Sequence, residues 1–244
     1  MQNFRVRPAE LADLPRCLDI DAGYVTRHVW QMQETFEEPL EPVDEDLGMG
    51  LSRSRNQVLG KSIAVNLPVF QMNLSPSRLP RPLAVPGPLN DQQLLGEWKK
   101  TDLLLVAESV DIEPHQAILM GDGDVPEPSL DEEGQPVMYR PAPPDILGYI
   151  GVSVDRTRHL AWITSHAVQL DFRRQGVGSE LLSEARNWAD RHRMRSLLVE
   201  LEIKNYPAIN YFQKNDFFFC GYNNAFYATR EIALFFGKRL EKFS

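Results

Sequence analysis

The chain has 244 residues, 43% of them hydrophobic, and a formal net charge of −8. This length can bury a full core, and no run approaches the ~18 consecutive apolar residues that a membrane-spanning helix requires. The sequence therefore excludes a helical membrane protein, and no signal peptide is expected, because the first residues lack an apolar core.

Two cysteines, Cys17 and Cys220, are too few for a disulfide framework. We expect both to be reduced thiols that are mostly buried. Together with the absence of a predicted signal peptide, this favours a cytoplasmic, soluble protein without a membrane partner. The sequence leaves the oligomeric state open, a homodimer included.

Charge is distributed unevenly along the chain. Residues 1–150 carry 24 acidic and 12 basic side chains, whereas residues 151–244 carry 10 acidic and 14 basic ones. A basic C-terminal part suits a phosphate-rich ligand, and an acidic remainder attracts a cationic partner. Solvated surface charge explains the same counts equally well. The basic run 191–195 is a candidate nucleic-acid patch, but the acidic overall charge argues against a nucleic-acid partner.

The first half of the chain begins with a short predicted strand, Phe4–Pro8, which proline ends. Ala9–Ile20 follows with Leu11, Leu14 and Leu18 at helical spacing, so these leucines should share one face of a helix.

Three acidic or proline-rich stretches interrupt this half, and we expect exposed loop insertions near residues 34–60, 75–90 and 121–144. Ser62–Phe70 predicts a strand interrupted at Pro68, and Asp102–Ser109 predicts a buried strand.

The second half alternates strands and helices in a regular order. Two antiparallel strands lead into a glycine turn, and a helix, a strand, a second helix and a closing hairpin follow. This order predicts an α+β fold built around one mixed sheet. The expected strands are Ile146–Val154, Leu160–Val168, Leu197–Ile203, Phe217–Tyr222 and Glu231–Gly237, and the second helix has Pro207 near its first turn.

The turn before the first of these helices contains Gly176 and Gly178. A helix start leaves backbone N–H groups unpaired, and the helix dipole adds positive potential there. Glycines let a phosphate approach this start, and Arg173 and Arg174 add charge beside it. An ordinary turn that needs glycine for its backbone angles is the alternative. A dinucleotide-binding turn would need a third spaced glycine, and a P-loop would need Gly-Lys-Ser/Thr, and both are missing.

Two ordered motifs resemble those of the GCN5-related N-acetyltransferases, the GNAT family. Arg173-Arg174-Gln175-Gly176-Val177-Gly178 fits Arg/Gln-x-x-Gly-x-Gly/Ala, and Asn205 to Phe217 resembles Asn-x-x-Ala, then Tyr, then Gly-Phe. Residues 21–32 and 219–227 are also similar to the streptothricin acetyltransferase branch. The resemblance implies a single GNAT domain over residues 1–244, with one mixed, largely antiparallel central sheet flanked by helices.

The resemblance also implies acetyl-CoA as co-substrate. The backbone N–H groups of Gln175 to Ser179 would hold the pyrophosphate, and the pantetheine arm would run along Ala167 and Val168. No metal is expected, because the histidines show no metal-ligand spacing. The residues expected to bind acetyl-CoA are Ala167, Val168, Arg173, Arg174, Gln175, Gly176, Val177, Gly178, Ser179, Asn205 and Phe212.

Acetyl transfer to an amine needs a group that takes a proton near pH 7. Glu200 is the best candidate base: burial on a central strand would raise its pKa, and protein N-terminal acetyltransferases of the family carry a catalytic glutamate there. Glu202 lies two residues on, on the same face. A solvated or salt-bridged carboxylate is the alternative for both. His166 is a second candidate base, although a lone histidine on a strand is more often a hydrogen-bonded core residue.

Phe212 departs from the family pattern, in which many enzymes carry a tyrosine that protonates the coenzyme A thiolate. The hydroxyl of Tyr222 or Tyr227 could replace it, and we include Tyr227 among the catalytic candidates. The thiolate could also leave unassisted, or the chain could bind coenzyme A without efficient turnover. Asp216, at the usual glycine of the second motif, is a milder departure.

The sequence therefore predicts an acetyl-CoA-dependent N-acetyltransferase that transfers the acetyl group directly to an amine. The acidic N-terminal part and the streptothricin acetyltransferase likeness favour a cationic small molecule, antibiotic- or polyamine-like, as acceptor. A protein or peptide amine is the main rival acceptor.

Overall fold

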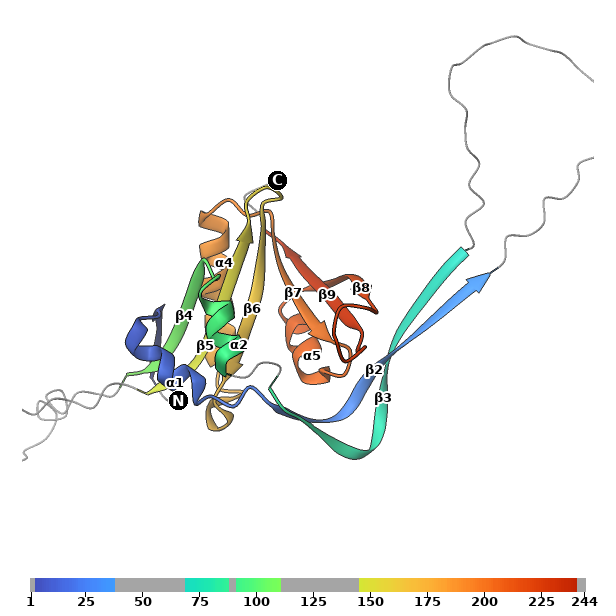
Figure 1. Cartoon of the computed structure of the whole chain (residues 1–244), viewed down its shortest axis with the longest axis horizontal. Coiled ribbons are helices and arrows are strands. Elements are labelled where there is room, and N and C mark those ends of the chain that lie inside the picture. The colour runs from blue at the N-terminus through green and yellow to red at the C-terminus, as the bar shows by residue number, and fades with distance from the viewer. Residues whose placement is uncertain (1–2, 38–68, 88–90, 111–144, 241–244) are drawn as a thin grey trace, which may run out of the picture.

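The computed structural model describes residues 3–37, 69–87, 91–110 and 145–240. Seven of its strands form one mixed sheet in the order β1-β4-β5-β6-β7-β9-β8, in which β6 and β7 run parallel and all other neighbours antiparallel. The other two, β2 and β3, pair as a long ribbon that extends beyond this sheet (Figure 1). The strands are β1 (Phe4–Pro8), β2 (Tyr24–Glu37), β3 (Val69–Val85), β4 (Leu103–Ser109), β5 (Ile146–Asp155), β6 (Leu160–Val168), β7 (Ser196–Glu202), β8 (Phe218–Asn223) and β9 (Ala233–Arg239).

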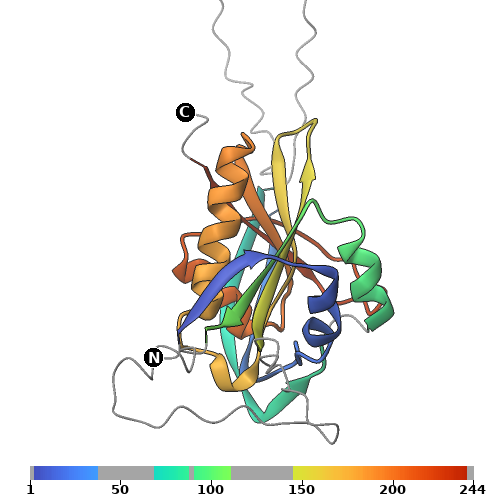
Figure 2. The ribbon, with the colours of Figure 1, turned by 90° about the vertical axis from the view of Figure 1, so that its left-hand side faces the viewer.

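Helices cover both faces of the sheet, with α2 and α4 on opposite sides (Figure 2). Side chains of α1 and α2 pack in one apolar cluster with β5 and β6, and side chains of α4 and α5 pack in a second cluster on the other face. The predicted α+β class, a mixed sheet flanked by helices, is thereby confirmed. The helical segments are η1 (Leu11–Asp13), α1 (Leu14–Leu18), α2 (Asp91–Trp98), η2 (Leu170–Phe172), α4 (Val177–Arg191) and α5 (Tyr206–Lys214).

Local sequence explains why the second half follows the predicted order closely. The apolar stripe of α4 is buried at Leu181, Leu182, Ala185 and Ala189, as the spacing requires. Helix α5 begins where the Asn205 side chain accepts a hydrogen bond from the Ala208 backbone N–H at 3.2 Å. The elements that frame the glycine turn are therefore held by ordinary amphipathic packing and capping.

The loop expected near residues 75–90 is wrong as far as residue 85, because these residues form most of β3. Prolines made the segment resemble a loop, yet the ribbon accommodates them. Leu79, Pro80, Arg81 and Pro82 stand opposite Arg27 alone, between the pairs Thr26–Leu83 and His28–Arg78. A bulge of this kind frees the prolines from ladder hydrogen bonds that they cannot donate.

The insertion expected near residues 34–60 also starts too early, since β2 continues to Glu37. Residues 38–68 and 111–144, which include most of that insertion, the start of the Ser62–Phe70 strand and the whole 121–144 insertion, lie outside the described residues.

Two further expectations need correction, whereas the strand expected over Leu160–Val168 has these bounds in the structure. The helix expected from Ala9 is a 3-10 turn followed by the short α1, and Leu11 is 85% exposed instead of facing the core. Cys17 is buried as predicted, but Cys220 is exposed, because it lies on the edge strand β8.

Helix α2 was not predicted. Its apolar residues Leu94, Leu95 and Trp98 have helical spacing. The segment is short and follows a proline-rich stretch, so this spacing was not recognised as a helix.

A buried ion cluster fixes β1 to the sheet. The carboxylate of Glu108, only 2% exposed, accepts hydrogen bonds from Arg5 and from Arg7. Arg7 also donates to both carboxylate oxygens of Asp13, at 2.6 and 2.9 Å. Each buried carboxylate is thus paired, as burial of a charge requires.

Within the described ranges, no helix is both long and apolar enough to cross a membrane.

Candidate active site

The candidate site lies where β6 and β7 separate. These parallel strands pair from Leu160–Ser196 to Ile163–Val199, and their pairing stops there although both strands continue. A bulge in β6 marks the separation: Gly151 pairs with Ser165 and Val152 pairs with Ile163, so Thr164 is an extra residue. The bulge bends β6 away from β7 and leaves its remaining edge free to pair with a ligand.

The bulge also reverses which side chains face which helices. Before it, Ala161 and Ile163 pack in the α4–α5 cluster. After it, Ala167 packs in the α1–α2 cluster, and His166 faces Tyr211 of α5. Residues expected to bind the pantetheine arm, Ala167 and Val168, therefore lie on the segment of β6 beyond the separation.

Buried polar atoms without a partner gather around this separation. Of the five buried side-chain atoms without a hydrogen-bond partner among the described residues, four lie on two strands: the Thr164 hydroxyl and His166 Nε2 on β6, and the Tyr24 hydroxyl and Trp30 Nε1 on β2. The fifth, Asp190 Oδ1, is on α4. Buried polar groups in folded proteins are almost always paired. A polar ligand at the separation would provide partners for those of the four atoms that face it, so this region has the properties of a binding site.

The glycine turn lies at the end of the free segment of β6. Gly176 has a left-handed backbone (φ 95°) and forms the N-cap of α4, which begins at Val177. The backbone N–H groups of Val177, Gly178 and Ser179 therefore have no carbonyl oxygen four residues earlier in the helix to which they could donate. Helix starts of this kind bind anions in other proteins, and the use of this one as a pyrophosphate seat stays a prediction.

The backbone conformation requires glycine at position 176 but not at position 178. A Cβ on Gly176 would touch nothing within 4 Å, but its positive φ disfavours any L side chain. A Cβ on Gly178 would make ordinary contacts of 3.5 Å with His166 Nε2 and Val168. Gly176→Ala should therefore lower the free energy of unfolding by about 1–2 kcal/mol, whereas Gly178→Ala should change it by less than about 0.5 kcal/mol. Urea denaturation measures both, and equal losses would contradict this assignment.

The arginines and glutamine of the turn have distinct contacts. Arg173 donates to the carbonyl oxygens of Val168, Asp21 and Gly23, at 2.8–3.2 Å. It therefore joins the end of β6 to the segment that leads into β2, and its guanidinium is already occupied. Gln175 donates to the Asp171 carbonyl at 2.7 Å, and Arg174 takes a positive φ of 66°.

Glu200 and Tyr227, two of the three predicted catalytic residues, lie together. Glu200 is on β7 just beyond the separation, on the face opposite the buried Val199 and Leu201, and the Tyr227 hydroxyl donates a hydrogen bond to Glu200 Oε1. Burial raises the pKa of Glu200 above its usual range, with a further contribution from Glu202. Burial and the adjacent Glu200 raise the pKa of Tyr227 as well, so Tyr227 remains protonated and can keep donating.

The surroundings of this pair are acidic. Glu202 lies on the same face of β7, and Lys204 forms ion pairs with Glu202 at 3.4 Å and with Glu231 at 3.2 Å. The Tyr24 pKa is raised by burial and then by Glu202 and Glu231. With one lysine against three carboxylates, these residues favour a cation near Glu200.

His166, the third predicted catalytic residue, lies on the opposite face from Glu200. Its ring centroid is 5.4 Å from that of Tyr211 and 6.2 Å from that of Phe212. Burial lowers the pKa of His166 to about 4, so the ring is neutral at pH 7 and a weak base.

Phe212 is 3% exposed and packs edge-on against Phe217 in the core. The neighbouring Tyr211 hydroxyl donates to the Gly178 carbonyl at 2.7 Å, which ties α5 to the start of α4. The structure thus brings Phe212 and Tyr211 beside the glycine turn. Asn205 caps α5, and its side-chain oxygen is used in that cap.

Sequence reasoning missed Tyr24, Trp30 and Thr164 as site residues. The first two belong to the stretch 21–32, which is similar to the streptothricin acetyltransferase branch but in which no single residue was predicted as a site residue. Thr164 carried no signal, because a bulge depends on strand pairing that spacing alone does not reveal. In the described part of the chain, no group of three or more histidines, cysteines or acidic residues could hold a metal ion.

Comparison with known proteins gives a family match and a set of similar structures. Residues 108–217 match the acetyltransferase (GNAT) family. The fold is similar to that of a nourseothricin acetyltransferase (TM-score 0.61, 16% identity, 98% of this chain and 99% of that chain covered). It is also similar to the proposed streptothricin acetyltransferase of Bacillus anthracis strain Ames in complex with acetyl coenzyme A (TM-score 0.58, 16% identity, 98% and 99% covered).

A third similar structure is the ribosomal-protein-S18-alanine N-acetyltransferase of Escherichia coli (TM-score 0.51, 13% identity, 98% and 95% covered). No curated protein matches the chain by sequence. At these identities the structural likeness concerns the fold, which is the GNAT fold.

Proposed function

We propose that this chain, which over residues 108–217 belongs to the GNAT family of acetyltransferases, acetylates an amine of a cationic small molecule with acetyl-CoA as co-substrate. The observation that carries the proposal is the Glu200–Tyr227 pair, which lies on an acidic face beside the separation of β6 and β7.

The residues present fit acetyl-CoA. The start of α4 offers N–H groups to a pyrophosphate, and the free edge of β6 at Ala167 and Val168 offers backbone groups to the pantetheine amides. The Thr164 hydroxyl could donate to or accept from the same arm, and the Trp30 Nε1–H could donate to it. When bound, acetyl-CoA supplies the acetyl group as a reactive thioester.

Glu200 is the base in this proposal. An amine is protonated at neutral pH and cannot attack until a proton is removed, and a carboxylate with a raised pKa is suited to take that proton. The Tyr227 hydroxyl donates to one carboxylate oxygen, so it orients Glu200 and leaves the other oxygen for the amine or for a bridging water. His166 is neutral, lies on the other face and does not act as the base.

The acceptor is proposed from the charge of the same face. Glu202 and Glu231 exceed the positive charge of Lys204, and Tyr24 presents a hydroxyl that has no partner among the described residues. Carboxylates and phenol rings together favour an ammonium group. Acetyltransferases of nourseothricin, of streptothricin and of a ribosomal protein all share the fold across nearly the whole chain, so the fold alone admits both kinds of acceptor, and the acidic face is what supports a cationic small molecule.

The first test is thermal stabilisation by acetyl-CoA, followed by thiol release with streptothricin, aminoglycosides, polyamines and short peptides. We expect a clear rise in Tm and thiol release with one class of small cationic amine. Release with peptides alone would replace the proposed acceptor by a protein amine. The absence of any Tm shift would overturn the acetyl-CoA site.

A second candidate function, a coenzyme A-binding module without useful turnover, is favoured by Phe212. Since that ring is buried against Phe217, a hydroxyl added by Phe212→Tyr would be desolvated in the core. We expect the variant to lose about 1–3 kcal/mol of stability and to gain no turnover. Single-turnover kinetics and urea denaturation measure the two effects. A large gain in turnover at unchanged stability would favour the binding module.

A further inference from the structure

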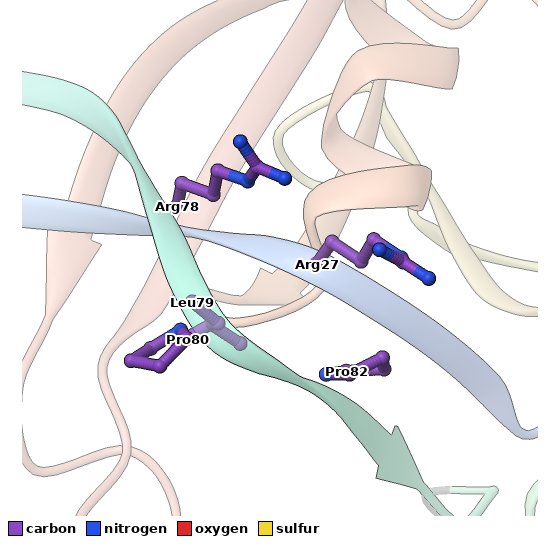
Figure 3. Close-up of a pocket in the computed structure, with 5 residues that line it drawn as sticks. All are labelled: Arg27, Arg78, Leu79, Pro80 and Pro82. Carbon is purple, nitrogen blue, oxygen red and sulfur yellow. The ribbon is translucent and has the colours of Figure 1, made fainter.

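Two arginines of the ribbon line a cavity that the proposed reaction does not use. The cavity has a volume of about 300 Å³ and lies at the bulge where Leu79 to Pro82 stand opposite Arg27. Arg27 and Arg78 extend from the crossing of β2 and β3 toward the same side, and Leu79, Pro80 and Pro82 complete the lining (Figure 3). The cavity therefore combines two cationic groups with an apolar wall.

Neither guanidinium has a hydrogen bond or an ion pair within the part of the chain that the structure describes. By contrast, Arg5, Arg7, Arg156 and Arg158 all pair with carboxylates. Two like charges that line one cavity repel each other, and a bound anion would offset that repulsion. Phosphate suits two guanidiniums well, since each can donate two parallel hydrogen bonds to it.

The position of β2 connects this cavity with the glycine turn. At one end of the strand, the Gly23 carbonyl accepts hydrogen bonds from Arg173 of the turn. Beyond Arg27, the His28 ring stacks on Tyr206 in the first turn of α5, with centroids 5.0 Å apart. Helix α5 is in turn bound to the start of α4 through Tyr211 and Gly178. Arg27 thus lies on a strand attached to both elements that flank the proposed pyrophosphate seat.

We infer that Arg27 and Arg78 form the site for the 3′-phosphate of the adenosine end of coenzyme A. The inference rests on the proposed function, since it assumes that the pyrophosphate occupies the start of α4. The nucleotide end leaves that seat carrying one further phosphate and an apolar purine. The cavity supplies a matching pair of surfaces: two guanidiniums for the phosphate and the Leu79, Pro80 and Pro82 wall for the base.

The test compares coenzyme A with 3′-dephospho-coenzyme A by isothermal titration calorimetry. The wild-type chain should bind coenzyme A at least about tenfold more tightly than the dephospho form, as expected for charged hydrogen bonds at an accessible site. The double variant Arg27→Ala/Arg78→Ala should bind both compounds with the affinity that the wild type has for the dephospho form. Both arginines are exposed, so the variant should keep the wild-type Tm.

Arg81→Ala is the matched control, because Arg81 is exposed in the same bulge but does not line the cavity. It should retain the full preference for coenzyme A. Equal wild-type affinities for the two compounds, or a double variant that keeps the preference, would overturn the inference and leave the proposed function standing. Failure of the wild type to bind either compound would overturn the proposed function and the inference with it.

Discussion

Glu200→Gln is expected to lower kcat/KM by about 10²–10⁴-fold, the contribution typical of a positioned general base. Glutamine keeps the shape of the side chain and can still accept a hydrogen bond from Tyr227, but it cannot take a proton. In the wild type, kcat/KM should rise with pH through the raised pKa of Glu200, and the variant should lose that rise. Steady-state rates across the pH range measure both effects.

Glu202→Gln is the matched control, because Glu202 lies on the same face of β7 and pairs with Lys204. Its effect should fall mainly on KM for the acceptor. Rates of Glu200→Gln within a few-fold of wild type at every pH would remove Glu200 from the role of base.

Stability gives Glu200→Gln a second signature. Burial raises the folded-state pKa of Glu200 above its unfolded value, so the folded state is disfavoured as pH rises through that range. Glutamine carries no charge and avoids this loss. The variant should therefore melt at or above the wild-type Tm at pH 8, which separates a catalytic defect from a folding defect.

Glu108→Ala is expected to lower the free energy of unfolding by about 3–5 kcal/mol, the usual result of removing one partner from a buried ion pair. The substitution leaves the partly buried Arg7 with only Asp13, whereas Arg5, whose side chain is 69% exposed, can be rehydrated. The loss should therefore lie toward the lower end of that range. Urea denaturation of the full chain measures it.

Glu97→Ala provides the comparison, since Glu97 forms an exposed pair with Lys100 and should cost no more than about 1 kcal/mol. Equal losses at the two sites would show that the buried cluster stabilises the fold no more than an exposed ion pair does.

Acid should weaken the same cluster. Arg7 holds the pKa of Asp13 below its usual range, so the stability that this ion pair contributes is present above the unfolded pKa and is lost as pH falls through the folded pKa.

The sequence predicted the second half of the fold well because each signal there is local. The glycine turn, the α4 stripe and the Asn205 cap depend on residues close together in sequence. Glu200 was placed on its strand for the same reason, whereas its contact with Tyr227 joins residues 27 apart in sequence and the catalytic roles of both stay a prediction.

The first half was harder to predict because its structure depends on long-range pairing. Prolines on β3 favour a loop until the bulge opposite Arg27 is known. Tyr24 and Trp30 approach β7 only because the ribbon crosses the end of the sheet, where the backbone N–H of Trp30 donates to the Ile203 carbonyl at 3.2 Å. Contacts of this kind have no periodicity that a sequence could display.

The extra residue at Thr164 gives β6 two phases of alternation along a single strand. A substitution scan that measures stability should detect this change. On the side of the sheet that faces α4 and α5, the sensitive positions should be odd-numbered before residue 164 and even-numbered after it. Deleting Thr164 would make Ser165 follow Ile163 directly, so the strand would alternate regularly with His166 and Val168 still facing α4 and α5, and β6 could continue pairing with β7. One inserted residue therefore separates a closed sheet from an open binding edge.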